Sequence, residues 1–115
     1  MVATKYDIKV EQGGTFELTV DVRRNGAALN TMDSGVVQIR PYRLSDEVYY
    51  EATEQDDLVL FNSQSQVQWT IPGTTTKDFD WYDGAEYDIY VTLTTGAPHR
   101  IAEGRVYLSP STTRS

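Results

Sequence analysis

The chain has 115 residues, with 17 acidic and 10 basic side chains, a net charge of −7, 39% hydrophobic residues and no cysteine. This length predicts a single domain over residues 1–115, and the absence of cysteine excludes disulfides, thiolate metal sites and cysteine nucleophiles. The surplus of carboxylates disfavours nucleic acid as a partner. No apolar stretch approaches the ~18 residues of a membrane helix, so we expect no membrane span and no export signal.

The first half of the chain alternates apolar and polar side chains with a period of two, which predicts strands. A leading strand carries Tyr6, Ile8 and Val10 on one face and stops at the turn Gly13-Gly14. The dipeptide Asn25-Gly26 predicts a turn that leads into a loop. The strands expected here are 6–10, 15–23, 36–42 with Val37 and Ile39 inward, and a short edge strand at 48–52.

The second half of the chain predicts two pairs of strands. Residues 58–61 and 66–71 flank the polar link 62–65 and are expected to pair as a hairpin, and the polar stretch 74–80 is expected to be a loop. A strand over 87–93 returns through the loop 95–99 into a strand over 100–109, with Gly104 as a bulge where the alternation slips. Helix has little support.

About seven or eight short strands at a spacing of roughly 8 to 12 residues predict an all-β sandwich, with a small barrel as the alternative. Residues 83–89 read D-G-A-E-Y-D-I and resemble the immunoglobulin stretch D-x-(G/A)-x-Y-x-C, with Ile89 at the cysteine position. The resemblance implies an immunoglobulin-like sandwich in which Gly84 and Tyr87 define the fold, and in which the Tyr87 hydroxyl bonds the backbone before its own strand. The aromatic residues expected in the core are Phe16, Phe61, Trp69 and Tyr87.

Residues that carry catalysis are sparse. His99 is the sole histidine and lies in a predicted hairpin loop, so no histidine pair is available to hold a transition metal. The chain has no nucleophile elbow, P-loop or dinucleotide fingerprint, and Gly13-Gly14 does not open a helix. We therefore expect no enzymatic activity, no cofactor and no metal site.

Acidic side chains gather where basic ones are missing. No Lys or Arg occurs between Arg43 and Lys77, and three interpretations stay open: a calcium site, a negative patch that steers a basic partner, or a solvated edge that deters aggregation. Asp56 and Asp57 are interface candidates, and they would also be the acids of a glycosidase-like enzyme. The carboxylates of this stretch are Asp46, Glu47, Glu51, Glu54, Asp56 and Asp57.

Aromatic side chains are the other candidates for a contact surface, because exposed Tyr and Trp bury much area at small entropic cost. Trp81 and Tyr82 are expected either to stack on a sugar ring, to anchor in a neighbouring subunit, or to staple the end of the sandwich. The aromatic residues placed at outward or loop positions are Tyr42, Tyr49, Tyr50, Trp81, Tyr82, Tyr90 and Tyr107.

The order of landmarks along the chain resembles a family of small tailed-bacteriophage and prophage proteins. Residues 6–16 read Y-D-I-K-V-E-Q-G-G-T-F and residues 103–110 read E-G-R-V-Y-L-S-P, which are similar to the opening and closing strands of that family. Some baseplate upper proteins have similar N-terminal domains that serve as immunoglobulin-like attachment modules. Residues 29–35 (L-N-T-M-D-S-G) depart from the family's D-L-T-G-Y segment.

The resemblance implies a virion structural protein that is assembled in the host bacterial cytoplasm. We expect an adaptor or assembly module of the tail, neck or baseplate that docks on other virion proteins, in multiple copies on a symmetric assembly. The alternatives are a capsid decoration protein and a host-surface carbohydrate-binding module. The ends, residues 1–5 and 110–115, are expected to be flexible or held by a partner.

Overall fold

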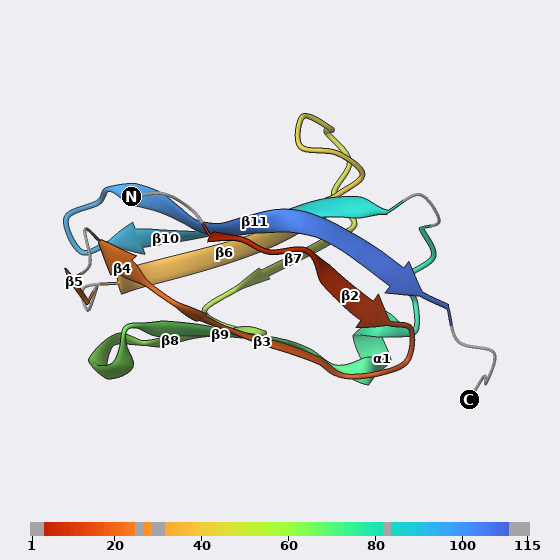
Figure 1. The fold of residues 1–115 in the computed structure, drawn as a ribbon, viewed down its shortest axis with the longest axis horizontal. Helices are drawn as coiled ribbons and strands as arrows, with labels where there is room; N and C mark the ends of the chain where they lie inside the picture. The colour runs from red at the N-terminus through yellow and green to blue at the C-terminus, as the bar shows by residue number, and fades with distance from the viewer. Residues whose placement is uncertain (1–3, 25–26, 29–31, 82–83, 111–115) are drawn as a thin grey trace.

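The computed structural model describes residues 4–24, 27–28, 32–81 and 84–110, and these form two sheets that face each other and a separate two-stranded sheet (Figure 1). The larger sheet has the order β1-β11-β10-β6-β7, with β2 also paired to β11, and the smaller sheet has the order β3-β9-β8. The elements are β1 (Thr4–Lys5), β2 (Ile8–Glu11), β3 (Phe16–Asp21), β4 (Arg23–Arg24), β5 (Ala27–Ala28), β6 (Met32–Arg40), β7 (Tyr50–Thr53), β8 (Leu58–Phe61), a 3₁₀ turn (Asn62–Gln64), β9 (Gln66–Ile71), α1 (Gly73–Thr76), β10 (Ala85–Leu93) and β11 (Pro98–Ser109).

The strand order is that of an immunoglobulin-like sandwich. Strands β3, β9 and β8 take the places of strands B, E and D, and β6, β10 and β11 take those of C, F and G. The predicted all-β, immunoglobulin-like sandwich is therefore confirmed. The N-terminal strands β1 and β2 add two parallel pairings to β11, with Thr4 opposite Ala102 and Ile8 opposite Val106.

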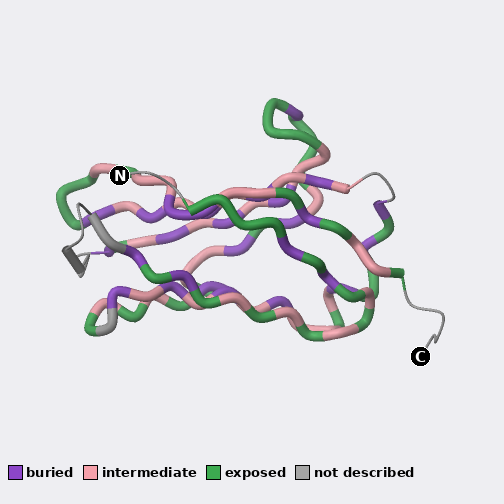
Figure 2. Tube along the Cα trace, in the orientation of Figure 1, coloured by how far each residue is buried: buried purple, intermediate pink, exposed green. Residues whose placement is uncertain are grey.

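The core lies between the sheets and follows from the period of two (Figure 2). In β10, Tyr87, Ile89 and Val91 face inward and are buried, while the residues between them face out, as predicted. Val37 and Ile39 of β6 do the same from the neighbouring strand. Alternation along one strand thus assigns each side chain to a face, because successive side chains of a strand point to opposite sides.

Trp69 of β9 is the centre of the core and has no exposed surface. Its indole N–H donates to the Tyr50 hydroxyl at 3.3 Å, and that hydroxyl donates to Asp57 Oδ2 at 2.6 Å. The rings of Phe16, Tyr50 and Tyr87 lie 5.1, 6.0 and 5.6 Å from the Trp69 ring. Burial, reinforced by the bond to Asp57, raises the pKa of Tyr50, so its hydroxyl keeps the proton that it donates.

Tyr87 clamps the N-terminal segment rather than the backbone before its own strand. Its hydroxyl donates to the carbonyl oxygen of Tyr6 at 2.6 Å. The proton of this hydroxyl therefore goes to the segment between β1 and β2, which lies alongside β11, whereas residues 82 and 83 of the turn before β10 lie outside the described residues. Gly84 is the other residue expected to define the fold. Its φ angle just before β10 is +79°, a backbone conformation that residues with a Cβ atom rarely adopt.

The bulge in the last strand lies at Ile101 and not at Gly104. Ile89 pairs with Ala102 while Tyr90 pairs with Arg100, so Ile101 is the extra residue, and both Ile101 and Ala102 are buried. Gly104 is required for a different reason, since a Cβ there would lie 2.2 Å from the carbonyl oxygen of Tyr6. The predicted slip in alternation is therefore confirmed, but the bulge at Ile101 causes it, and the close approach of the Tyr6 backbone explains the glycine at 104.

Other local predictions also need correction. Strand β4 pairs with β5, so the chain forms a short hairpin where a loop was expected; the turn residues Asn25 and Gly26 lie outside the described residues. The 74–80 stretch overlaps α1, whose Thr76 donates to the Gly14 carbonyl at 2.7 Å.

Phe61 was also misplaced, and of the N-terminal end 1–5 only residues 4 and 5 are described. Phe61 is exposed, because β8 turns Leu58 inward and Phe61 outward. At the N-terminal end, Thr4 and Lys5 are paired in β1.

The Trp69–Tyr50–Asp57 chain generates a stability prediction. We expect Tyr50→Phe to lower the free energy of unfolding by about 1–3 kcal/mol, because the buried indole N–H of Trp69 loses its acceptor. Chemical denaturation monitored by Trp fluorescence measures this change. The matched control is Tyr107→Phe, which removes the hydroxyl of an exposed ring and should change the free energy of unfolding by less than about 0.5 kcal/mol. Equal losses of unfolding free energy in the two variants would show that the buried hydrogen bond contributes nothing.

Candidate docking face

The outward side of the larger sheet concentrates charged and tyrosine side chains. Register places Asp88 of β10 between Gln38 of β6 and Glu103 of β11, because residues opposite each other share a face. By the same register Glu86 lies between Arg40 and Arg105, and Tyr90 lies between Val36 and Arg100. This surface, called the outer face below, comprises Val36, Gln38, Arg40, Arg43, Glu86, Asp88, Tyr90, Arg100, Glu103, Arg105 and Tyr107.

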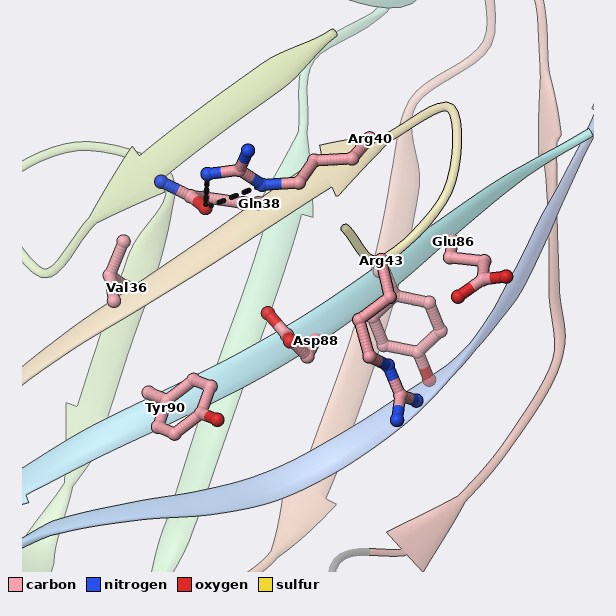
Figure 3. Close-up of a pocket in the computed structure, with 8 residues that line it drawn as sticks. Val36, Gln38, Arg40, Arg43, Glu86, Asp88 and Tyr90 are labelled. Atoms are coloured by element: carbon pink, nitrogen blue, oxygen red, sulfur yellow. Dashed lines mark hydrogen bonds between the residues drawn. The ribbon is translucent and has the colours of Figure 1, made fainter. Parts of the chain in front are cut away.

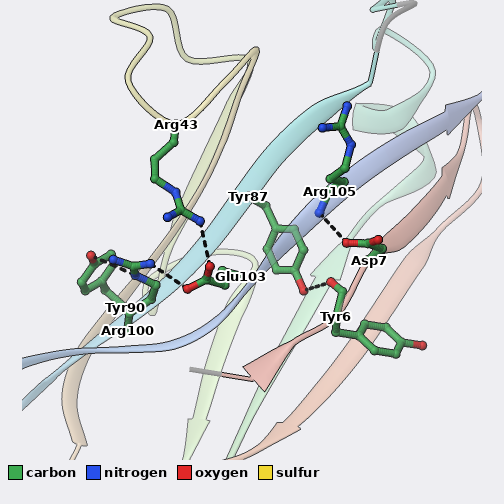
Figure 4. Close-up of polar contacts among 8 residues, drawn as sticks. All are labelled: Tyr6, Asp7, Arg43, Tyr87, Tyr90, Arg100, Glu103 and Arg105. Atoms are coloured by element: carbon green, nitrogen blue, oxygen red, sulfur yellow. Dashed lines mark hydrogen bonds and ion pairs between the residues drawn. The ribbon is translucent and has the colours of Figure 1, made fainter. Parts of the chain in front are cut away.

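Arginines of the outer face are held by carboxylates and rings (Figure 4). Glu103 accepts from Arg100 Nη1 at 2.6 Å and from Arg43 Nη2 at 2.8 Å, and these two bonds lower the pKa of Glu103. The Arg100 guanidinium lies 5.7 Å from the centre of the Tyr90 ring and donates to its hydroxyl at 3.3 Å. Arg105 lies 5.8 Å from the Tyr107 ring centre in the same manner. Arg43 and Arg100 are therefore held in place by Glu103 and, for Arg100, by Tyr90.

Asp88 lies in the middle of a shallow recess of about 170 Å³ on this face (Figure 3). Gln38 and Arg40 line one side, and Arg40 donates to Gln38 Oε1 at 2.8 and 3.1 Å and to the Ser45 carbonyl. No hydrogen bond to the half-buried Asp88 carboxylate occurs within the described ranges. Desolvation raises the pKa of Asp88 against the opposing effect of nearby arginines. Folding therefore gains nothing from the charge of Asp88.

A second recess, of about 500 Å³, lies at the base of the loop between β6 and β7. Trp81 lines it but is only 7% exposed, and its ring stacks on Tyr49 at 5.0 Å and an interplanar angle of 6°. Phe79 contacts the same ring at 4.8 Å. The outward placement of Trp81 is corrected, and it acts as the staple of this end of the sandwich. Its indole N–H has no partner among the described residues. The recess is lined by Pro41, Tyr42, Glu47, Tyr49, Asp80, Trp81 and Gly84.

The predicted site residues separate into distinct places. Tyr90 and Tyr107 belong to the outer face, and Tyr42 and Tyr49 line the second recess with Trp81. Tyr50, expected outside, is 8% exposed in the core, because register with Ile39 turns it inward. Tyr82 lies outside the described residues.

The two aspartates proposed as interface or catalytic residues shape a turn. Asp56 Oδ1 accepts from the backbone N–H groups of Thr53 and Asp57, both at 2.7 Å, which closes the connection from β7 to β8. Asp57 accepts the Tyr50 hydroxyl. Within the described ranges no group of three or more metal-ligating side chains gathers, and no described helix is long and apolar enough to cross a membrane.

The arginines and Asp88 of the outer face were not singled out by their sequence. The alternation of apolar and polar residues did place Gln38, Arg40, Asp88 and Tyr90 outward. This pattern is the part of the outer face that the sequence could indicate. Their convergence depends on the pairing of β10 with both β6 and β11. Neither protein-family models nor curated proteins give a match to the chain. The fold and this face define an immunoglobulin-like module with an outward surface rich in tyrosine and arginine.

Asp88 generates a prediction about pH and stability. Because its pKa is raised on folding, the folded protein binds this proton more tightly than the unfolded chain, and stability falls as pH rises through the carboxyl range. Asp88→Asn removes the charge, so we expect a higher unfolding midpoint at neutral pH and a difference that vanishes in acid. Thermal denaturation across pH checks this, with the exposed Glu17→Gln as control. A lower midpoint for Asp88→Asn at neutral pH would contradict it.

Proposed function

We propose that the protein is a structural docking module of a tailed-bacteriophage particle that binds neighbouring virion proteins through the outer face. The observation that carries the proposal is Asp88, a half-buried carboxylate to which no described residue donates a hydrogen bond, in a surface where arginines lie over tyrosine rings. Tyr and Arg dominate the binding energy of protein interfaces, and a residue that costs stability is commonly kept for function. The role needs no catalysis and no cofactor.

Placement in a virion draws its support from the family resemblance. The two segments that carry it, residues 6–16 and 103–110, include β2 and most of β11, which lie side by side with Lys9 opposite Tyr107. Both segments that resemble the phage family therefore pair with each other in one parallel ladder, which supports an architecture shared with that family. The proposed station is the tail, neck or baseplate, where several copies dock on a symmetric lattice after assembly in the host cytoplasm; capsid decoration is the alternative.

Mixing the purified chain with the other structural proteins of the particle tests the proposal. Light scattering and electron microscopy are expected to show a defined ring or a decorated particle. We expect Tyr107→Ala to weaken this association by about five- to thirtyfold, because an aromatic side chain at an interface is worth about 1–2 kcal/mol. Phe61→Ala, an exposed aromatic on the opposite sheet, is the matched control. A monomer that binds no virion protein at micromolar concentration would sink the proposal.

Carbohydrate binding is a second candidate, favoured by the second recess. Its lining combines exposed Tyr42 with the carboxylates of Glu47 and Asp80. An aromatic platform beside hydrogen-bonding groups is suited to a sugar ring.

A glycan array tests this second candidate. Binding is expected to be lost in Tyr42→Ala, which removes the exposed ring, and to persist in Tyr6→Ala, which removes an exposed ring elsewhere. Trp81→Ala is unsuited to this experiment, because a buried aromatic staple contributes about 3–5 kcal/mol to folding. Absence of binding to any glycan would exclude the recess as a sugar site.

A further inference from the structure

The loop between β6 and β7, residues 41–49, stands away from the sandwich and carries apolar side chains in solvent (Figure 1; yellow). Leu44 is 89% exposed, Tyr42 is 59% exposed and Val48 is 39% exposed. They are three of the seven large hydrophobic side chains that are exposed among the described residues. Most of the loop surface is exposed in Figure 2. Folding therefore leaves a local concentration of apolar surface unburied.

The backbone of the loop is nevertheless held in one shape. The N–H of Ser45 donates to the Tyr42 carbonyl at 3.0 Å, which closes a turn with Arg43 and Leu44 at its centre. The N–H of Glu47 donates to the buried Ser45 hydroxyl at 3.0 Å, and Arg40 donates to the Ser45 carbonyl.

Two further contacts tie the loop to the sheet. Arg43 Nη2 bonds Glu103 of β11 at 2.8 Å, and at the other end the N–H of Tyr49 donates to the Ile39 carbonyl at 2.7 Å. The turn that presents Leu44 is thus fastened at both sides. A braced loop loses little conformational entropy on binding, which makes exposed apolar side chains on it effective contacts.

Charge around the loop specifies what kind of surface it fits. Asp46 and Glu47 are exposed beside the apolar residues, and the chain has no Lys or Arg from residue 44 to residue 76. Arg43, the one cation of the loop, is engaged by Glu103. A partner that meets this loop gains from basic side chains around an apolar centre, whereas a second copy of a chain with net charge −7 is repelled.

We propose that loop 41–49 is a preformed docking arm that places Leu44 in an apolar pocket rimmed by Lys or Arg on a partner protein. The arm deepens the proposed docking function and rests on it, since it adds a second contact to the same module. The inference rests on the exposed fraction of Leu44 and on the hydrogen bonds that hold its turn. The negative charges of Asp46 and Glu47 indicate that the partner has basic side chains around the pocket.

A random peptide library panned against the immobilised full chain tests the arm with a defined probe. Enriched peptides are expected to combine apolar residues with Lys or Arg, and added salt is expected to weaken their binding. Leu44→Ser is expected to reduce binding at least about tenfold while leaving the fold unchanged, because the side chain is almost wholly exposed. The matched control, Val59→Ser, removes a side chain that is 42% exposed on β8 and should bind as the unchanged protein does.

Several results would overturn the arm. They are no enrichment over blank support, enrichment of acidic peptides, or equal binding by Leu44→Ser. Self-association that Leu44→Ser abolishes would make the occupant a second copy, and Leu44-dependent binding to phosphatidylglycerol vesicles would make it a membrane; either overturns the proposed partner. If peptides bind in a Leu44-dependent way while Tyr107→Ala leaves virion assembly unchanged, the docking arm is supported and the proposed role of the outer face is overturned. If Tyr107→Ala weakens assembly while no peptide binds in a Leu44-dependent way, only the docking arm is overturned.

Discussion

A fully buried indole N–H needs an acceptor, and the hydroxyl of Tyr50 supplies one for Trp69. Trp69 belongs to the smaller sheet and Tyr50 to the edge of the larger one, so this hydrogen bond joins the two layers. The same hydroxyl donates to Asp57 in the turn that leads to β8. Because desolvation raises the pKa of Tyr50, the donor keeps its proton, and the two edge strands are fixed to the core by one chain of polar contacts.

Fixing β7 in this way has consequences at the surface. With Tyr50 turned inward, the loop before it must span from Arg40 to the strand start within nine residues, and hydrogen bonds around Ser45 close it into a turn. The salt bridge from Arg43 to Glu103 ties that turn across the sheet to β11. The loop is thus fastened both to the strand that the core fixes and to β11, whose pairing with β10 forms the outer face.

Two residues on this side of the molecule have no explanation in folding. Asp88 is half-buried and accepts no hydrogen bond from the part of the chain that the structure describes, and Leu44 exposes nearly all of its side chain on a fastened turn. Natural sequences are consistent across levels except at functional or strained sites, where local costs of this kind are expected. The two residues lie on one side of the larger sheet and on the loop beside it, which is the side through which we propose that the protein docks.

The main strands and their inward faces were determined by the sequence alone, because a period of two assigns Tyr87, Ile89 and Val91 to one face wherever the strand lies. The immunoglobulin-like form was implied by the resemblance of residues 83–89, and strand pairing decided between a sandwich and a barrel. The candidate site was determined only in part: Tyr90 and Tyr107 were placed outward, whereas Tyr50 and Trp81 were placed wrongly. Adjacent tyrosines such as Tyr49 and Tyr50 have the same composition around them, and only the register of β7 on β6 decides which one is inward. The grouping of Asp88 with Arg40 and Glu103, and the exposure of Leu44, depended likewise on strand pairing across long sequence separations, which the local pattern of residues does not encode.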